Sequence, residues 1–554
     1  MNRIVVLLIL LIAFSCKEKT SSGNEEIILW QPYSDSAEVA ANADHEKERM
    51  RYKFIQSKVL DKNDVFRPLY HEVKKMSEAE YQSLKPLILE KDIPTLQKHI
   101  ADGKLTYENL VVFYLYRIYK YELDNTTTLN TVIALNKNVV EEAREKDKTM
   151  ARGLDSEHAI YGMPILLKDN INTLGMKTTA GAIALMNNEV EDAFIVKRLK
   201  ENGALILGKV NLSEWANFLC NCPNGQSAVG GQTLNPYGRR ILDTGGSSAG
   251  SGTSMAANFA VGAVGTETSG SILSPSGQNS VVGLKPTIGL LSRTGIVPIS
   301  STLDTPGPMS KNVIDNTILL SAMIGKDEAD PTSVDTDKNY LEVVMDSVSL
   351  RGKRLGAMKN LLETDSIYKE TIERLKQFGA EIIEFSPPEI ELDGFLSILN
   401  IDMRNDLPKY LEEHSNPVKV KIKSIADAVA FNTSDSLARI PYGQARFEGI
   451  LKDSTTAEGL EKIKSDLEKN GRIFFDTAMD KYQLNAVLSI NNYHAAYAAV
   501  AKYPALTVPM GYRASGEPIS LTFIGKQFKE ADLLRLGAAF EREFRVRKMP
   551  KGYH

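Results

Sequence analysis

The sequence has few cysteine and histidine residues, and this scarcity limits the chemistry that it can perform. Its 554 residues include three cysteines and seven histidines. No second Cys or His pair stands at zinc-site spacing, so we expect no metal site. The 66 Lys and Arg residues nearly balance the 70 Asp and Glu residues, for a net charge of −4. A chain without a basic excess is not expected to bind nucleic acid, so its expected partners are small molecules or peptides.

Long hydrophobic runs are also scarce, and the first one has the features of an export signal. Residues 4–14 are apolar but too few to cross a bilayer. Arg3 precedes this run, and Ser15 and Cys16 follow it, so residues 1–16 resemble a bacterial lipoprotein signal peptide. The resemblance implies cleavage before Cys16, lipidation of its thiol and membrane anchoring at the bacterial cell envelope, in the periplasm or on the outer surface. The alternative is an ordinary signal peptide with an incidental cysteine.

The other two cysteines, Cys220 and Cys222, are separated by a single residue. An exported protein meets oxidising conditions, which favour disulfides. A bridge across one residue nevertheless fits the required Cα separation and Cβ directions poorly. We therefore expect two free thiols buried near the core.

Changes in composition divide the chain into regions. Residues 17–45 are rich in Ser, Glu, Asp, Ala and Asn, which predicts a flexible tether. Residues 46–90 are charged with scattered apolar positions and predict an N-terminal helical extension. Residues 91–550 are expected to form the main domain. Within it, residues 311–480 are charged and are predicted to be helical, and we expect them to shape the substrate pocket.

Strand and helix patterns alternate in the main domain and predict an α/β fold. The apolar residues 163–167 predict a strand that ends at Lys168, and residues 192–202 predict a helix followed by a strand at 204–207. Further expected elements are a helix within 130–149, strands within 484–526, a last helix over 530–544, and helix N-termini at Ser77 and Thr106.

The segment 245–272 is rich in Gly and Ser, and two common interpretations of such a segment have to be compared with it. A phosphate-binding loop needs a Lys after its glycines, where this chain has Met255 and Ala256. An α/β-hydrolase elbow centred on Ser248 needs an acid and a histidine downstream. The histidines that follow it are His414, His494 and His554. A histidine-dependent esterase that uses Ser248 and His494 stays open as an alternative.

Several segments, in order along residues 90 to 550, resemble the amidase signature family. They are Gly-Met-Pro-Ile-Leu-Leu-Lys-Asp-Asn at 162–170, Gly-Gly-Ser-Ser at 245–248, Gly-Thr-Glu-Thr-Ser-Gly-Ser-Ile at 265–272, Gly-Leu-Lys-Pro-Thr at 283–287 and Tyr-Pro-Ala-Leu-Thr-Val-Pro-Met-Gly at 503–511. Ser-Arg-Thr-Gly-Ile-Val-Pro-Ile-Ser at 292–300 is most similar to the peptide amidase branch. The resemblance implies one large α/β domain, with a mixed central β-sheet covered by helices on both faces.

The resemblance also implies a role for each matching residue. Ser271 would be the nucleophile, Ser247 a bridging serine and Lys168 the base. The backbone N–H groups of Thr268, Ser269, Gly270 and Ser271 would stabilise the oxyanion. Supporting roles fall to Asp169, Ser248 and Thr266.

This set of residues makes coherent chemistry for hydrolysis of carboxamide bonds. A serine hydroxyl needs a base to take its proton, and a lysine can be that base only when it is neutral. Burial favours the neutral amine, and Lys168 follows three apolar residues. Lowering its pKa from about 10.4 to about 8 costs about 3 kcal/mol. An acyl-enzyme would form and release ammonia or an amine from peptide C-terminal amides or small aliphatic or aryl amides, with no metal or organic cofactor.

The sequence departs from the family pattern beside the nucleophile. Ser269 stands where Gly, or Asp in the peptide amidase branch, is usual, and Leu273 stands where many members have Arg. The second change puts recognition of acidic substrate groups in doubt. Two further alternatives stay open. One is the amidase subunit of a tRNA-dependent amidotransferase, against which the signal sequence argues. The other is a lipoprotein that binds amides on a decayed enzyme fold.

Overall fold

The computed structural model describes residues 27–153, 158–336, 338–345 and 349–554. Its centre is an eleven-stranded sheet in the order β1-β3-β2-β6-β8-β7-β12-β13-β11-β9-β10. The strands are β1 (Val132–Leu135), β2 (Pro164–Lys168), β3 (Leu205–Val210), β6 (Gly262–Glu267), β7 (Val282–Lys285), β8 (Thr305–Ser310), β9 (Arg354–Met358), β10 (Glu381–Phe385), β11 (Ala486–Ile490), β12 (Ala505–Tyr512) and β13 (Pro518–Ile524). A separate pair is formed by β4 (Gln226–Ser227) and β5 (Gly231–Gln232).

The sheet is mixed, and its interior strands are buried. β2 lies parallel to both β3 and β6, whereas β6 pairs antiparallel with β8. Every residue of β2 and β6 is buried. Parallel strands covered on both faces read as continuous apolar runs, which is why the segment before Lys168 was recognisable as a strand. The expected α/β fold with a mixed central sheet flanked by helices is confirmed.

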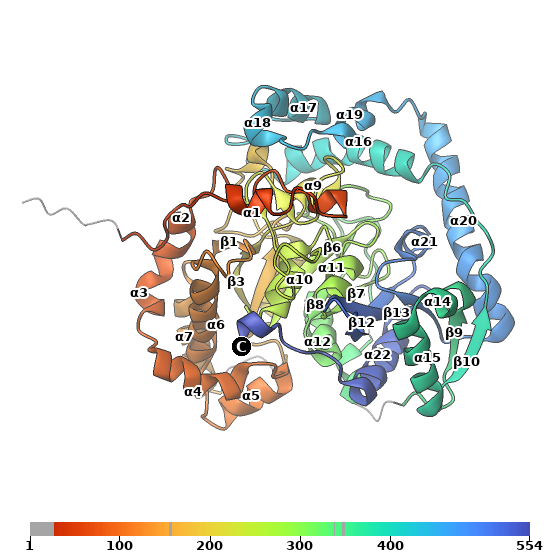
Figure 1. Ribbon diagram of the computed structural model, residues 1–554, viewed down its shortest axis with the longest axis horizontal. Helices are drawn as coiled ribbons and strands as arrows, with labels where there is room; N and C mark the ends of the chain where they lie inside the picture. The colour runs from red at the N-terminus through yellow and green to blue at the C-terminus, as the bar shows by residue number, and fades with distance from the viewer. Residues whose placement is uncertain (1–26, 154–157, 337, 346–348) are drawn as a thin grey trace, which may run out of the picture.

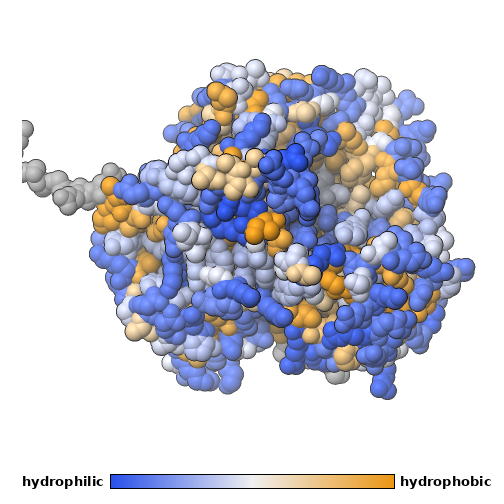
Figure 2. Space-filling view, in the orientation of Figure 1, coloured by the Kyte–Doolittle hydropathy of each residue, from blue (hydrophilic) through white to orange (hydrophobic). Residues whose placement is uncertain are grey.

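Helices surround this sheet (Figure 1). They are α1 (Ser36–Ala40), α2 (Lys62–Phe66), α3 (Tyr70–Val73), α4 (Glu78–Ile88), α5 (Ile93–Ala101), α6 (Tyr107–Glu122), α7 (Val139–Ala151), α8 (Phe194–Glu201), α9 (Glu214–Asn217), α10 (Ala249–Ala256), α11 (Leu273–Gln278), α12 (Val313–Met323), α13 (Tyr340–Met345), α14 (Lys359–Thr364), α15 (Ser366–Gln377), α16 (Phe395–Glu413), α17 (Ile425–Thr433), α18 (Ser436–Arg439), α19 (Ala445–Lys452), α20 (Ala457–Tyr482), α21 (Ala495–Val500) and α22 (Glu530–Phe544). Within the described ranges, no helix combines the length and the apolar character that a membrane span requires. The face seen in Figure 2 is largely hydrophilic, with hydrophobic residues scattered over it.

Local sequence signals place several helix ends correctly. The Ser77 hydroxyl accepts a hydrogen bond from the Glu80 N–H at the start of α4. The Thr106 hydroxyl does the same for the Asn109 N–H at the start of α6. Both side chains satisfy backbone donors that have no partner inside the helix. The last helix, predicted over 530–544, is α22 with the same limits.

Three predictions about the chain's organisation need correction. Residues 130–149 are not one helix, because 132–135 form β1, which pairs with β3 in the sheet. The region 311–480 is not wholly helical, since it also supplies β9 and β10 at one edge of the sheet. The predicted tether spans 17–45, and its described part, residues 27–45, packs on the domain. Trp30 there is buried, and its indole N–H donates to the Asn125 Oδ1 at 2.7 Å.

Residues 1–26 lie outside the described residues. The predicted signal peptide, Cys16 and the first part of the tether therefore remain predictions from the sequence.

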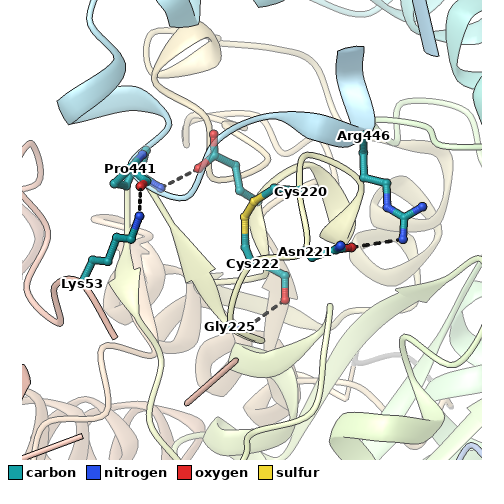
Figure 3. The surroundings of a disulfide bond; sticks show 10 residues. Lys53, Cys220, Asn221, Cys222, Gly225, Pro441 and Arg446 are labelled. Atoms are coloured by element: carbon teal, nitrogen blue, oxygen red, sulfur yellow. Dashed lines mark hydrogen bonds between the residues drawn. A yellow bond between two sulfur atoms is a disulfide. The ribbon is translucent and has the colours of Figure 1, made fainter. Parts of the chain in front are cut away.

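The expectation of free thiols at Cys220 and Cys222 is wrong, because the two residues form a disulfide (Figure 3). Their Cα atoms are 5.1 Å apart, which lies within the range that a bridge can span. The short turn between them therefore provides the separation that sequence proximity alone seemed to forbid. Cys220 is buried and Cys222 is half-buried.

Candidate active site

Two of the three predicted catalytic side chains meet at the centre of the sheet. Lys168 ends β2, and Ser247 lies just before α10. Both are fully buried, and the Lys168 amine lies 2.7 Å from the Ser247 hydroxyl oxygen. The β2 strand ends between β3 and β6, so its last side chain emerges where the carboxyl ends of parallel strands gather. Ligand sites of α/β sheets commonly occupy this edge.

Thr266 of β6 supplies the other contacts of the Lys168 amine. Its carbonyl oxygen lies 3.1 Å and its hydroxyl oxygen 2.8 Å from the nitrogen. The Asn170 amide also donates to the Thr266 hydroxyl, at 3.0 Å. Burial lowers the pKa of Lys168 to about 7, although the charges of Asp304 and Glu267 favour its protonated form. Near neutral pH a large share of this amine is therefore unprotonated.

The third predicted side chain, Ser271, lies two residues before α11. Its carbonyl oxygen accepts a hydrogen bond from the Ser248 N–H at 3.2 Å, which joins the two serine segments. The Ser248 hydroxyl in turn donates to the Thr266 carbonyl at 3.1 Å. The Ser271 hydroxyl makes no hydrogen bond to any described residue, and the residue is half-exposed. The Ser271 backbone is thus fixed beside Ser248, but its hydroxyl is not hydrogen-bonded to Ser247 in this structure.

The Glu267 carboxylate shapes the turn that carries Ser271. It accepts hydrogen bonds from the N–H groups of Gly270 at 2.7 Å, Ile272 at 2.7 Å and Leu273 at 3.0 Å. The expected oxyanion donor Gly270 is therefore occupied by this carboxylate, which corrects that assignment. Gly270 also has a φ of +89°, which a residue with a side chain rarely adopts.

The remaining expected donors are not occupied in the same way. The backbone N–H groups of Thr268, Ser269 and Ser271 donate no hydrogen bond to the described part of the chain. They lie on the turn that the Glu267 carboxylate fixes. These N–H groups are therefore the available donors beside Ser271.

Asp169, for which a supporting role was expected, makes no hydrogen bond to the Lys168 amine in the described structure. Its carboxylate pairs with the Lys209 amine at 3.2 Å, and it accepts hydrogen bonds from the Thr179 hydroxyl and N–H. Both partners of the ion pair are fully buried, and removing one would leave the other charge uncompensated. Asp169 therefore neutralises Lys209 and fixes the loop at Thr179.

Several polar residues of the site had no predicted role. Besides Asn170 and Glu267, these are Asp304 and Lys285. Asp304 accepts hydrogen bonds from the Thr268 hydroxyl at 2.5 Å and the Ile299 N–H at 2.8 Å, and burial raises its pKa to about 6. Burial lowers the pKa of Lys285, in the Gly-Leu-Lys-Pro-Thr segment, to about 8. That segment was noticed in the sequence, but its pattern does not reveal which residues its lysine faces.

A cavity of about 390 Å³ borders the lysine side of the site. Asn170, Thr266 and Thr268 line it from the catalytic segments. Asp406 and Tyr410 of α16 line it from the region 311–480. The cavity is large enough to hold a small amide or part of a peptide.

His494 is not placed to act on Ser248. Its Nδ1 shares a hydrogen bond of 2.6 Å with the Ser489 hydroxyl, and its ring lies beside Phe474. Burial lowers the pKa of His494 to about 4. The Ser248 hydroxyl is instead bonded to Thr266. The geometry therefore gives no support to the histidine-dependent alternative.

Comparison with known proteins gives a consistent result. Residues 110–441 match the family described as Amidase. A probable amidase of Arabidopsis thaliana is 35% identical over 493 residues, which cover 84% of this chain and 92% of that protein. The crystal structure of an amidase family protein from Bacillus anthracis str. Ames is similar, with 37% sequence identity and a TM-score of 0.84. The similarity covers 90% of this chain and 100% of that chain. The native peptide amidase from Stenotrophomonas maltophilia is 36% identical, covers 83% of this chain and 98% of that chain, and has a TM-score of 0.78.

The lowered pKa of Lys168 has a measurable effect on stability. The unfolded chain keeps a proton on this amine up to about pH 10.4, but the folded chain only up to about pH 7. Unfolding therefore takes up a proton between these values, and stability rises with pH across that window. We expect the unfolding free energy of the wild type, relative to Lys168→Met, to increase by about 2 kcal/mol from pH 7 to pH 9. Denaturant titrations of both proteins measure this difference, and an unchanged difference would contradict the lowered pKa.

Proposed function

Since this chain belongs to the amidase family, we propose that it hydrolyses carboxamides through a triad of Ser271, Ser247 and Lys168. Carboxamide hydrolysis is the reaction of the family. The proposed triad assigns the steps of that reaction to three residues of this chain. The observation that carries it is the 2.7 Å contact between the buried Lys168 amine and the Ser247 hydroxyl. A fully buried lysine whose partner is a serine hydroxyl is more typical of a catalytic site than of a structural contact.

The contacts of Lys168 suit the neutral form of its amine. A neutral amine offers two N–H donors and one lone pair. The two donors match the carbonyl and hydroxyl oxygens of Thr266. The lone pair is then free to accept the proton of the Ser247 hydroxyl. Ser247 becomes a proton carrier between the base and the nucleophile.

The proposed reaction uses this relay in both directions. The Ser271 hydroxyl turns toward Ser247, attacks the amide carbon and gives its proton to Ser247 as Ser247 gives its own to Lys168. The oxyanion of the tetrahedral intermediate accepts hydrogen bonds from the N–H groups of Thr268, Ser269 and Ser271. One good donor of this kind contributes about 3–4 kcal/mol. The relay then protonates the leaving amine, and water cleaves the acyl-enzyme by the same route.

The proposed substrates are peptide C-terminal amides first, and small aliphatic or aryl amides second. The similarity to the peptide amidase of Stenotrophomonas maltophilia over most of both chains supports the first class. The half-exposed position of Ser271 also suits a substrate that enters from the surface. The 390 Å³ cavity beside Thr266 and Thr268 has room for part of such a substrate.

Ammonia release tests the proposed function directly. A panel of peptide amides, simple carboxamides and glutamine is incubated with the wild type and with Ser271→Ala. We expect release from peptide amides and a fall in kcat/KM of at least about a thousandfold in the variant, because the nucleophile is lost. Ser276→Ala, which changes a buried serine of the adjoining helix α11, is the matched control and should retain activity. Release that survives Ser271→Ala would refute the triad, and release from glutamine alone would favour the amidotransferase alternative.

The pH dependence of hydrolysis tests the role of Lys168. The base must be neutral, and its pKa is about 7. With a neutral peptide amide, kcat/KM should fall about tenfold per pH unit below 7 and level off above it. Lys168→Arg should be inactive throughout, because a guanidinium stays protonated. A profile that is flat between pH 5 and pH 8 would exclude Lys168 as the base.

We further propose that the mature protein is a lipoprotein of the bacterial cell envelope, anchored through Cys16. The order of Arg3, the apolar run 4–14 and Cys16 supports this location. Cells that produce the full chain with labelled palmitate should yield labelled protein. Cys16→Ala should lose the label, whereas Cys220→Ser/Cys222→Ser should keep it. An unlabelled wild type, or a labelled Cys16→Ala variant, would refute the anchor.

A further inference from the structure

Positive side chains gather around a large surface cavity beside the disulfide. The cavity has a volume of about 900 Å³. Its cationic lining residues are Lys47, Arg49, Arg51, Lys53 and Arg446, and its acidic lining residue is Glu48. Four of these cations belong to the segment 47–53, which precedes the part of the chain that matches the family, 110–441. The segment therefore adds a charge that the family match does not include.

Three of these cations have no acidic partner in the described part of the chain. The Lys53 amine donates to the Pro441 carbonyl at 2.7 Å, and the Arg51 Nε donates to the His45 carbonyl at 2.9 Å. The Arg446 guanidinium donates to the Asn221 side-chain oxygen at 3.1 Å. Neutral oxygens orient these groups without cancelling their charge. The cavity wall is thus left with an excess of positive charge.

The other two cations are balanced locally. Arg49 pairs with Asp243 at 2.6 Å, and Lys47 lies 3.6 Å from Glu517. This difference matters, because only uncompensated charges attract an anion strongly. The attraction is therefore concentrated at Arg51, Lys53 and Arg446. Figure 3 shows Lys53 and Arg446 on either side of the disulfide loop.

The cavity shares part of its wall with a second one, which is also lined by residues of the catalytic segments. The second cavity has a volume of about 290 Å³, and both are lined by Lys47, Arg49 and Asn224. Its wall includes Gly245, two residues before Ser247, and Ser274, whose N–H donates to the Gly270 carbonyl at 2.7 Å. We call these two adjoining cavities together the cationic trough. One end is lined by the surface cations, and the other by Ser274, three residues after Ser271.

We propose that the cationic trough binds carboxylate groups of the substrate, so that the enzyme prefers amides of acidic peptides. The inference rests on the proposed amide hydrolysis and names a substrate class for it. A negative side chain some residues away from the scissile amide would lie among Arg51, Lys53 and Arg446 while the amide reaches Ser271. A hollow that adjoins the catalytic segments suits an extended peptide better than the flat surface of a large macromolecule.

The disulfide contributes to this recognition by fixing Asn221. This residue stands between Cys220 and Cys222, and its side chain accepts the hydrogen bond from Arg446 of α19. The bridge closes the loop on both sides of the acceptor. This hydrogen bond therefore restricts the Arg446 guanidinium to one position at the wall of the trough.

A matched pair of substrates tests the inference. The full-length protein is assayed with acetyl-Glu-Glu-Phe amide and with its isostere acetyl-Gln-Gln-Phe amide at low ionic strength. We expect kcat/KM to be about tenfold higher for the acidic peptide, because each of its two carboxylates can pair with one of the three uncompensated cations. Added NaCl should reduce this ratio because salt screens exposed charges. In Arg51→Gln/Arg446→Gln the ratio should fall to about threefold or less, because Lys53 is the one uncompensated cation of the three that remains.

The control variant is Lys359→Gln, which removes an exposed positive charge on α14, away from the trough. It should keep the ratio of the wild type. A thermal unfolding transition like that of the wild type shows that a variant is folded. If the double variant does not fold, the effect of NaCl on the substrate ratio of the wild type tests the inference. Equal rates for the two peptides in the wild type, or a ratio that survives in the folded double variant, would overturn the inference and leave amide hydrolysis standing. Hydrolysis of neither peptide would count against the proposed function itself.

Discussion

The structure depends most on the burial of one amine, that of Lys168. An ammonium group without solvent needs acceptors or must lose its proton, since an unpaired buried charge is very costly. Here both solutions operate, because Thr266 and Ser247 surround the nitrogen and its pKa falls to about 7. These contacts require β2 and β6 to be neighbours and the start of α10 to cross above them. The central order of the sheet is thus tied to the proton chemistry of the site.

A second constraint is the carboxylate of Glu267, which gathers three N–H groups of the turn after β6. Charge-assisted hydrogen bonds of this kind are stronger than neutral ones. They fix the direction of the turn, and hence the position of Ser271 relative to Ser247. The same contacts decide which N–H groups remain for a substrate, because the Gly270 donor is used inside the protein. One acidic side chain therefore sets both the position of the nucleophile and the available oxyanion donors.

Much of this arrangement could be predicted from the sequence where short-range rules apply. Helix caps such as Ser77 and Thr106 act within three residues, so their pattern is visible in the chain. The apolar run before Lys168 predicts a buried strand for the same reason. The contacts that sequence reasoning missed join distant segments. Examples are the ion pair of Asp169 with Lys209 and the pairing of β1 with β3, which local patterns cannot reveal.

The prediction of free thiols at Cys220 and Cys222 was wrong for a different reason. Sequence separation was used as a substitute for the Cα distance, which the turn sets at 5.1 Å. The family resemblance supplied the ordered segments of Lys168, Ser247 and Ser271, but not the residues that hold them. Such positioning residues emerge only when the strands have been assembled.

The two outer strands of the sheet are the places where a strand of another molecule could add to it. A sheet of eleven strands ends in two edges, and an unpaired edge is a template for aggregation. At one end β10 carries Glu381 and Glu384, which face Arg354 and Lys376. At the other end β1 has four residues and an irregular register between Val132 and Ala134. The charges on β10 and the short, irregular β1 both disfavour the addition of a strand from another molecule. Neither edge is therefore a long, uncharged strand of the kind that promotes aggregation.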